Sequence, residues 1–505
     1  MLSRIHSCEL YGLEGKLIDV EVFVGRGKAG DFIIIGLPDA AINEAKIRIR
    51  TALKNTDLGY PYNKSVIVNL APADIKKEGP SYDMAFAAGI LMAMYDLTPN
   101  VDDTIMVGEL SLNGDFRHIK GILSIVDAAK HNGYINIFVP YCDRKEASLI
   151  SGINIFPFKN LHELLHHLDG NTLIKAIISE KLTCIEPTQI YAYDMSYIKG
   201  QTHAKRALEI AACGQHNMIM SGPPGSGKTL LAKTLPSILP KMNEMEMIEV
   251  TKLYSITNNL RSESPLLQQR PYRSPHHSSS PTSLVGGGRI PKPGEISLAH
   301  RGVLFLDEFP EFPREALEIL RQPLEDGIVS IARVEASLTY PARFMLLASQ
   351  NPCPCGYYGD SQRECICPPH AITRYKQKIS GPILDRIDIH IEVPRISFDE
   401  INKDSLEEDS ASVRRRVEQV RSIQEERFKG LSISYNSEMQ NKEIKKFCRI
   451  DSEGEELMKQ AMTQLNLSAR SYNRLLKLAR TISDLDFSEN IKSSHIAEAL
   501  QYRFN

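Results

Sequence analysis

The sequence predicts a multidomain α/β protein: an α/β domain at the N-terminus, a second α/β domain with a parallel sheet in the middle, and an all-helical domain at the C-terminus. First, the 505 residues correspond to about three domains at roughly 150 residues each. Second, a glycine-rich motif at 222–229 follows a short apolar run and precedes a helical pattern, as in nucleotide-binding α/β domains. Third, apolar residues recur at helical spacing from residue 401 onward.

The composition is that of an ordinary globular protein, with 42% hydrophobic and 24% charged residues. The 60 Lys and Arg residues nearly balance the 62 Asp and Glu residues. Overall charge therefore cannot drive nucleic-acid binding, and any basic surface must be local. The longest apolar stretch, 84–95, is too short to span a bilayer, and the N-terminus lacks an apolar signal segment. We expect a cytoplasmic protein without a membrane partner.

Residues 1–170 have the pattern of one α/β domain. Apolar and acidic residues alternate over 18–24, which is typical of a half-buried strand. Short β-branched runs bounded by Gly, Pro or Asn are typical of buried strands. We expect strands at 18–24, 32–35, 66–70, 104–110 and 135–139, and helices at 40–53 and 82–95. The less patterned segment 171–193 is the expected linker.

Residues 194–395 carry the nucleotide-binding chemistry. The sequence GPPGSGKT at 222–229 has the G-x-x-x-x-G-K-[ST] pattern, whose glycines let successive backbone N–H groups point at phosphates. Lys228 is expected to reach the β- and γ-phosphates and Thr229 to bind Mg²⁺. The predicted nucleotide-binding residues of this phosphate loop are Gly222, Pro223, Pro224, Gly225, Ser226, Gly227, Lys228 and Thr229.

Two further parts of the predicted site follow buried strands. The apolar run 303–306 ends at Asp307 and Glu308. Asp307 is expected to hold Mg²⁺, and Glu308 to orient or deprotonate the attacking water. A second apolar run ends near Asn351, which is placed to sense the γ-phosphate. The pattern favours hydrolysis of the nucleotide over binding alone.

Cationic side chains complete the predicted site. Arg386 is a candidate arginine finger, which acts on the nucleotide of a neighbouring subunit; a salt bridge to Asp385 or Asp388 is the alternative. Arg470 and Arg474 begin a helical pattern near the C-terminus. Either is placed to reach phosphates from a helical lid, and solvent exposure of one or both is the alternative.

Four of the nine cysteines are clustered in the segment 353–367, the cysteine loop. In a reducing compartment such a cluster indicates metal binding rather than disulfides. Four thiolates suffice for a structural Zn²⁺ site, and a reduced loop without metal is the alternative. The candidate ligands are Cys353, Cys355, Cys365 and Cys367.

Besides the phosphate loop, the chain carries PYRSPHH at 271–277, GEISLAHRGVLFLDE at 294–308, NPCPCG at 351–356 and ILDRID at 383–388. In this order the motifs resemble the Mg-chelatase-like AAA+ ATPases, and within them the ComM/YifB group of competence-associated proteins. The resemblance extends over essentially the whole chain. It implies an ATPase that depends on ATP and Mg²⁺ and assembles as a ring, expected to be a hexamer.

The resemblance also assigns roles. Asn351 stands at the sensor 1 position, Arg386 at the arginine finger, and Arg470 at sensor 2, with Arg474 as the second choice. It makes 329–339 similar to a pore-facing hairpin and 255–299 similar to the helix-2 insert of this clade. The implied domains are 1–170, a linker at 171–193, an AAA+ domain at 194–395 and a helical lid at 396–505.

The first domain resembles the proteolytic domain of Lon. The sequence KEGPS at 77–81 stands where Lon carries its nucleophilic serine, but Leu123 stands at the position of the partner lysine. A serine needs a base within hydrogen-bond distance to act as a nucleophile. We therefore expect a Lon-like fold without peptidase activity.

The function implied by the resemblance is a DNA motor, a helicase or translocase that promotes branch migration in natural transformation or recombination. A chelatase-like motor that remodels a partner protein is the alternative. Contacts to DNA phosphates would give affinity that falls with salt, without base specificity. The candidate phosphate contacts are Arg270, Arg273, Arg289, Lys292, Arg301, Arg333, Arg374, Lys376 and Lys378.

Overall fold

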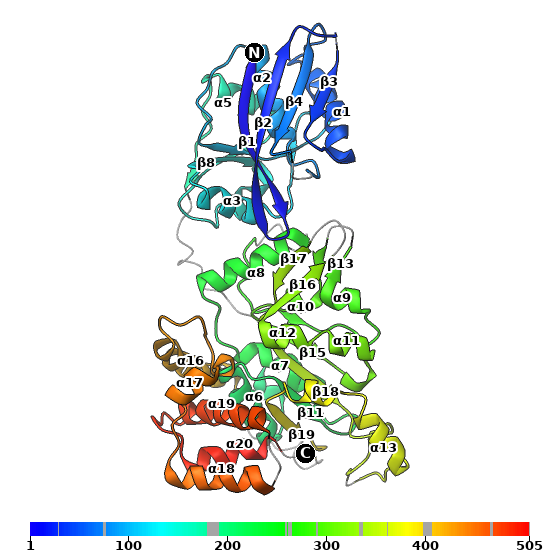
Figure 1. Cartoon of the computed structure of the whole chain (residues 1–505), viewed down its shortest axis with the longest axis vertical. Helices are drawn as coiled ribbons and strands as arrows, with labels where there is room; N and C mark the ends of the chain where they lie inside the picture. The colour runs from blue at the N-terminus through cyan, green and yellow to red at the C-terminus, as the bar shows by residue number, and fades with distance from the viewer. Residues whose placement is uncertain are drawn as a thin grey trace. The chain divides into compact units, whose positions relative to one another are not determined.

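The computed structural model divides the chain into two compact units (Figure 1). The first unit consists of Met1–Pro187 and Glu244–Leu267, and the second of Thr188–Asn243 and Gln268–Asn505. The structure describes residues 1–505 except 29, 74–76, 179–190, 258–259, 261–264, 289–290, 333–336, 361, 397–406, 465–467 and 504–505. None of the helices in the described residues is both long enough and apolar enough to cross a membrane.

The first unit is built on an eight-stranded mixed sheet with the order β10-β9-β8-β5-β1-β2-β4-β3. The long hairpin of β1 and β2, seen in Figure 1, is antiparallel, whereas β5, β8 and β9 run parallel to β1. The predicted alternation is confirmed, because Ile18, Val20, Val22 and Val24 of β2 are all buried. The strands are β1 (Leu2–Tyr11), β2 (Glu14–Gly25), β3 (Phe32–Ile35), β4 (Ser65–Ala71), β5 (Thr104–Met106), β8 (Asn136–Pro140), β9 (Asn154–Phe158) and β10 (Ile177–Ile178), with the small hairpin β6 (Glu109–Leu110) and β7 (Phe116–Arg117).

The helices of this unit complete its core. Helix α2 is buried on all sides because every residue after Asp83, the first of the helix, is apolar. Its one buried carboxylate, Asp83, receives a hydrogen bond from Arg48 Nε at 2.9 Å. Strand β10 pairs with β9, so part of the expected linker 171–193 belongs to the sheet. The helices are α1 (Ala40–Asn55), α2 (Asp83–Met94), α3 (Ile122–His131), α4 (Arg144–Ala147) and α5 (Leu161–Leu168).

One helix of the first unit comes from the middle of the sequence. Helix α8 (Glu244–Thr257) packs against α3 and α4. Lys252 Nζ lies 2.6 Å from Asp127 Oδ2, and Ser255 Oγ donates a hydrogen bond to Glu146, a buried carboxylate. Leu266 is buried in the same apolar cluster. The chain therefore passes from the second unit to the first and back between residues 243 and 268.

The second unit contains a five-stranded parallel sheet with the order β12-β15-β18-β11-β19. This confirms the expected parallel α/β fold. In such a sheet the carboxyl ends of all strands meet at one edge, where ligands bind. The strands are β11 (Met218–Ser221), β12 (Tyr272–Arg273), β15 (Val303–Leu306), β18 (Met345–Gln350) and β19 (Ile389–Glu392), and the flanking helices include α6 (Thr202–Gly214), α7 (Lys228–Ile238), α11 (Arg314–Glu318), α12 (Arg321–Asp326), α13 (Pro369–Lys376) and α14 (Gly381–Leu384).

The segment expected to be a long irregular insert contains several short elements. Helix α9 (Pro281–Val285) is followed by a small hairpin of β13 (Gly286–Gly287) and β14 (Lys292–Pro293), and then by α10 (Glu295–Leu298). The two β-like runs expected around residue 333 form an antiparallel hairpin, β16 (Ile328–Ala332) and β17 (Ser337–Pro341).

The C-terminal part is helical, as expected. Figure 1 shows these helices together, from orange to red. Val413, Val417 and Val420 are buried, which confirms the helical spacing used to predict this part. The helices are α16 (Ser410–Arg427), α17 (Asn441–Phe447), α18 (Ser452–Gln464), α19 (Ala469–Leu485) and α20 (Ser493–Gln501).

Candidate active site

The phosphate loop connects β11 to the N-terminus of α7. Gly225 and Gly227 have φ values of +80° and +91°, conformations that side chains with a Cβ rarely adopt. A Cβ on either glycine would meet open space, so their backbone faces a free volume. Ser226 Oγ is buried and lacks a hydrogen-bond partner among the described residues. These features fit a loop that surrounds a phosphate group.

Backbone carbonyls of the phosphate loop hold Lys228. Its Nζ lies 2.6 Å from Gly222 O, 3.0 Å from Pro223 O and 3.4 Å from Asn351 Oδ1. Burial lowers the pKa of Lys228, while Asp307 and Glu308 oppose that shift. The structure thus brings the predicted lysine and the predicted sensor asparagine together.

The predicted magnesium ligands, Thr229 and Asp307, also lie close together. Thr229 Oγ1 lies 3.0 Å from Asp307 Oδ2. The other carboxylate oxygen, Asp307 Oδ1, accepts hydrogen bonds from Ser349 Oγ and from the backbone N–H of Glu308. A hydroxyl and a carboxylate at this distance are the hard oxygen donors that Mg²⁺ prefers, so these residues fit the ion.

Glu308 lies beside Asp307 with an unusual backbone. Its φ and ψ are +54° and +47°, in the left-handed region. Its Oε2 lies 3.0 Å from Nδ1 of His277, which follows β12. Strand β12 runs parallel to β15, and this pairing brings His277 to the edge of the sheet where Glu308 lies.

Arg386 forms its hydrogen bonds away from the phosphate loop, with residues of α12 and α14. It is 7% exposed, and it donates hydrogen bonds to Glu325 and, at 2.7 Å, to Pro382 O. The hydrogen bond from Arg386 lowers the pKa of Glu325. Neither Asp385 nor Asp388 takes part in these contacts. The structure therefore does not contain the salt bridge that was the alternative role of Arg386.

The two lid arginines differ in environment. Arg474 Nη1 lies 2.8 Å from Asp388 Oδ1, and His216 Nδ1 lies 3.1 Å from Asp388 Oδ2. Burial would raise the pKa of Asp388, but Arg474 and His216 hold it well below its usual range. Arg470 is exposed and lines, with Glu325, a polar cavity of about 880 Å³. Arg474 lines the same cavity while pairing with Asp388, and Arg470 lies near the partner of Arg386.

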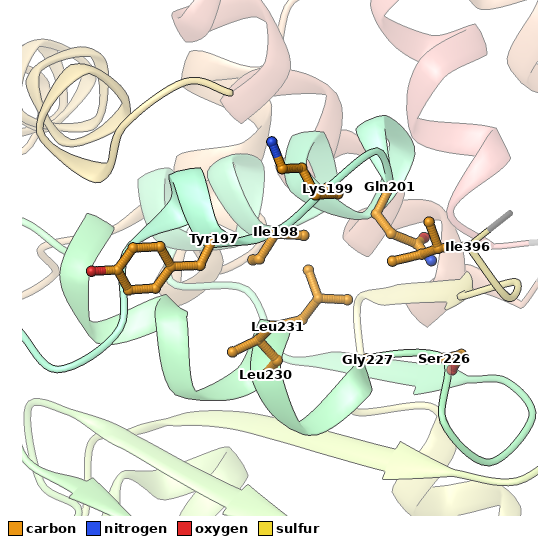
Figure 2. A pocket seen from close by; sticks show the side chains of 9 residues that line it. All are labelled: Tyr197, Ile198, Lys199, Gln201, Ser226, Gly227, Leu230, Leu231 and Ile396. Carbon is orange, nitrogen blue, oxygen red and sulfur yellow. The ribbon is translucent and has the colours of Figure 1, made fainter. Parts of the chain in front are cut away.

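A second cavity lies beside the phosphate loop, and the sequence did not predict it. It has a volume of about 200 Å³. Figure 2 shows Ile198 and Leu231 between the segment 197–201 and helix α7, with Ser226 and Gly227 nearby. Apolar walls next to a phosphate site fit a flat heteroaromatic base. The lining residues are Tyr197, Ile198, Lys199, Gln201, Ser226, Gly227, Leu230, Leu231 and Ile396.

The four clustered cysteines come together as predicted. Their sulfur atoms all lie within 4.8 Å of one another. Cys353 Sγ lies 3.3 Å from Cys355 Sγ and 3.7 Å from Cys365 Sγ. In a tetrahedral site with Zn–S bonds of about 2.3 Å, neighbouring sulfurs are about 3.8 Å apart. The four thiols therefore fit one metal ion.

The cysteine loop also contacts the nucleotide site. Gly356 has a φ of +86°, and a Cβ placed on it would lie 2.6 Å from Pro224 Cδ and 3.8 Å from Asn351 Cγ. The loop begins two residues after Asn351. The cysteine loop thus packs directly on the phosphate loop and on the sensor asparagine.

Two candidate DNA contacts take part in the fold instead. Arg270 donates to Pro240 O and Arg301 O, both at 2.7 Å, and Arg273 forms two hydrogen bonds with Glu295 at 2.6 and 2.7 Å. Lys378 pairs with Glu311 at 2.9 Å. Arg289 and Arg333 lie outside the described residues. The exposed candidates are Lys292, Arg374, Lys376 and Lys378, whose ion pair with Glu311 lies at the surface.

In the first unit, Leu123, which stands at the position of the partner lysine of Lon, is buried, and the lysine three residues before it, Lys120, is exposed. The segment that carries Ser81 is held by carboxylates: Glu9 accepts a 2.6 Å hydrogen bond from the N–H of Glu78, and Asp39 accepts one at 3.2 Å from the N–H of Gly79. Burial raises the pKa of Glu9 to about 7, although hydrogen bonds from Tyr82 and Glu78 oppose the shift. Glu9 and Asp39 were not singled out from the sequence.

Three family models match the chain. The model "Magnesium chelatase, subunit ChlI" matches residues 194–401, its C-terminal counterpart matches 407–503, and "Subunit ChlI of Mg-chelatase" matches 20–143.

Similar proteins cover the same range. The chain is 41% identical to Competence protein ComM of Haemophilus influenzae, over 99% of this chain and 97% of that protein. It is 40% identical to YifB of Escherichia coli, again over 99% and 97%. A shorter match, 35% identity over 111 residues, relates 21% of the chain to 19% of Lon protease 2 of Bacillus subtilis.

Proposed function

Since the chain belongs to the ComM/YifB family of Mg-chelatase-like AAA+ ATPases, we propose that it is an ATP-hydrolysing ring motor acting on DNA, a helicase or translocase that promotes branch migration in natural transformation or recombination. The observation that carries the proposal is the nucleotide site itself. Lys228 Nζ lies 3.4 Å from Asn351 Oδ1, and Thr229 Oγ1 lies 3.0 Å from Asp307 Oδ2, so the residues expected to act on the phosphates and on Mg²⁺ are close together.

Each residue of the nucleotide site has its own role in the proposed hydrolysis. Lys228 neutralises charge on the β- and γ-phosphates, and Thr229 and Asp307 would hold Mg²⁺, which would stabilise the charge that develops on the phosphate oxygens. Asn351 contacts Lys228 and positions the γ-phosphate. Glu308 accepts a hydrogen bond from the attacking water and orients it. The apolar cavity beside α7 holds the adenine ring.

The arginines support an assembly of several copies. Within the described part of the chain, Arg386 donates hydrogen bonds to Glu325 and to Pro382 O rather than to its own phosphate loop. Arg470 lines the cavity that contains Glu325. We infer that both arginines serve the nucleotide of a neighbouring copy in a ring, expected to be a hexamer.

DNA is the proposed substrate because the relative with 41% identity is named a competence protein and because exposed cations lie in the second unit. Lys292 lies in the insert, and Arg374 and Lys376 lie on α13, which follows the cysteine loop. Such residues contact phosphates without reading bases.

Steady-state ATPase with and without forked and single-stranded DNA, at low and moderate salt, tests the proposal. We expect stimulation by DNA that fades as salt increases, and no turnover in Glu308→Gln, which still binds ATP. Turnover that is indifferent to DNA refutes the DNA motor and favours the alternative, a motor that remodels a protein partner.

We also propose that the cysteine loop binds one structural Zn²⁺. Four protein ligands leave no open position on the metal, so its role is to hold the loop. Metal analysis of the purified chain should find about one zinc per chain. Cys365→Ser should lower the bound zinc, whereas Cys142→Ser, at an exposed cysteine outside the cluster, should leave it unchanged; equal zinc content in both variants contradicts the site.

A further inference from the structure

The cysteine loop presents two large side chains to solvent. Tyr358 is 52% exposed and Ile366 is 85% exposed. The backbone N–H of Tyr358 donates a hydrogen bond to Cys353 Sγ at 3.3 Å, and the N–H of Cys367 donates one to Cys365 Sγ at 3.4 Å. The sulfur cluster therefore fixes the backbone of Tyr358 and the turn that contains Ile366, while both side chains stay uncovered.

The adjacent tyrosine has a different environment. Arg363 Nη1 donates a 2.9 Å hydrogen bond to the hydroxyl of Tyr357, and the guanidinium of Arg395 lies 5.5 Å from the centroid of the Tyr357 ring. Arg395 also pairs with Asp360 of the same loop at 3.1 Å. Tyr357 thus serves the packing of the loop, whereas Tyr358 leaves half of its surface open to a ligand.

Basic side chains follow the cysteine loop and approach Tyr358. Lys376 Nζ, on α13, lies 5.8 Å from the centroid of the Tyr358 ring. Figure 1 shows α13, in yellow, at the outer margin of the second unit. Lys378 is paired with Glu311. The other exposed charged residues of 353–378 are Arg363, Arg374 and Lys376 on the basic side and Glu364 on the acidic side. This surface is therefore locally basic, although the charges of the whole chain nearly balance.

We propose that the cysteine loop and α13 bind single-stranded DNA, with the ring of Tyr358 stacked on a base and with Arg374 and Lys376 in contact with phosphates. The inference rests on the proposed function, since it assigns the DNA of that function to one surface of the chain. An exposed aromatic ring beside a cation suits a ligand that carries a flat ring and a negative charge in every repeating unit. In duplex DNA the faces of the bases are covered by their neighbours, so a single strand is what offers a free base face to Tyr358.

Ile366 extends this surface with an apolar side chain. Cys353 Sγ and Cys365 Sγ are 3.7 Å apart, so the turn that contains Ile366 lies close to the backbone of Tyr358. Apolar side chains of DNA-binding proteins insert between bases. Ile366 supplies such a contact to a second base of the bound strand.

The test is fluorescence anisotropy on the full-length chain with two labelled probes of equal length. One probe is an oligothymidine strand, and the other is an abasic strand, which has the same phosphates without bases. We expect Tyr358→Ala to weaken binding of the oligothymidine by roughly 5- to 150-fold and to leave binding of the abasic strand unchanged. Tyr358→Phe should bind both strands like the wild type, because it keeps the face of the ring.

Two further variants separate stacking from charge. Tyr62→Ala is the matched control, since Tyr62 is 51% exposed but lies in the first unit, and it should bind both strands like the wild type. Lys376→Ala should weaken binding of both strands alike. It should also make the fall of log affinity with log salt shallower by about 0.7, because one phosphate contact is lost. Thermal unfolding of each variant is recorded to compare the folded states.

Binding of oligothymidine by Tyr358→Ala at the wild-type affinity overturns the inference. An equal loss of affinity for the abasic strand overturns it as well, and would indicate an anionic ligand without bases, such as an acidic peptide segment. The proposed function fails on a different result, a wild-type turnover that does not respond to DNA, whatever the affinities of the variants. The two failures are therefore distinguishable.

Discussion

Replacing Gly356 by Ala tests whether the cysteine loop supports the phosphate loop. Gly356 has a φ of +86°, and a Cβ there would lie 2.6 Å from Pro224 Cδ and 2.8 Å from Pro224 Cγ. Carbon atoms in contact are normally about 3.5–4.0 Å apart. Pro224 must therefore move by about 1 Å, and because the proline ring is rigid, the backbone of the phosphate loop must move with it.

The chain offers a control with the same backbone strain. Gly359 has a φ of +78°, but a Cβ on it meets nothing within 4 Å. Alanine at a left-handed position costs about 1–2 kcal/mol in either variant. Only Gly356→Ala adds the crowding of a packed contact, about 1–3 kcal/mol, and this cost falls on the nucleotide site.

We therefore expect Gly356→Ala to weaken ATP binding by roughly 5- to 100-fold and Gly359→Ala to leave it nearly unchanged. The assay is an equilibrium titration with a fluorescent ATP analogue and Mg²⁺, with thermal unfolding recorded for both variants. Equal ATP affinity in the two variants, at equal loss of stability, would refute the reasoning.

Two further predictions concern the arginines and the lid. Arg386→Ala should bind ATP normally but hydrolyse it about 10³–10⁵ times more slowly; mixing it with Glu308→Gln chains should restore part of the turnover if the arginine acts on a neighbouring copy, and no recovery would count against that. Asp388→Asn should lower the free energy of unfolding by about 3 kcal/mol, measured by urea titration. Because the folded-state pKa of Asp388 is lowered, its contribution is complete above the unfolded pKa of about 3.9 and is lost as pH falls through the folded pKa. The difference between wild type and variant should thus be constant from pH 5 to 8 and shrink below about pH 4; a difference that grows below pH 4 would contradict the assignment.

The parts of the site that the sequence predicted depend on local geometry. The phosphate loop requires glycines at fixed positions because its backbone must face the ligand, and Asp307 must follow a buried strand to reach the sheet edge. These two requirements place Thr229 Oγ1 within 3.0 Å of Asp307 Oδ2. The four cysteines are similarly close in sequence, so their meeting requires only one short loop.

The parts that were missed depend on contacts between distant segments. Ile198 and Ile396 line the same cavity, but each is a single aliphatic residue in a loop, and no periodicity marks it. The charge of Arg273 suggested DNA, whereas Glu295 binds it within the insert. Charge in a sequence does not reveal whether the folded chain already supplies the partner.

Helix α8 has a consequence for any attempt to produce the ATPase part by itself. A fragment that begins at Thr188 keeps this helix but loses the surface on which Met247, Ile248 and Leu266 are packed. The orphaned apolar stripe would favour self-association, and the carboxylate partner of Lys252 would be gone. A cut placed by linear order alone thus yields an incomplete folding unit, and a soluble ATPase fragment would need the segment 244–267 replaced by a short polar connection.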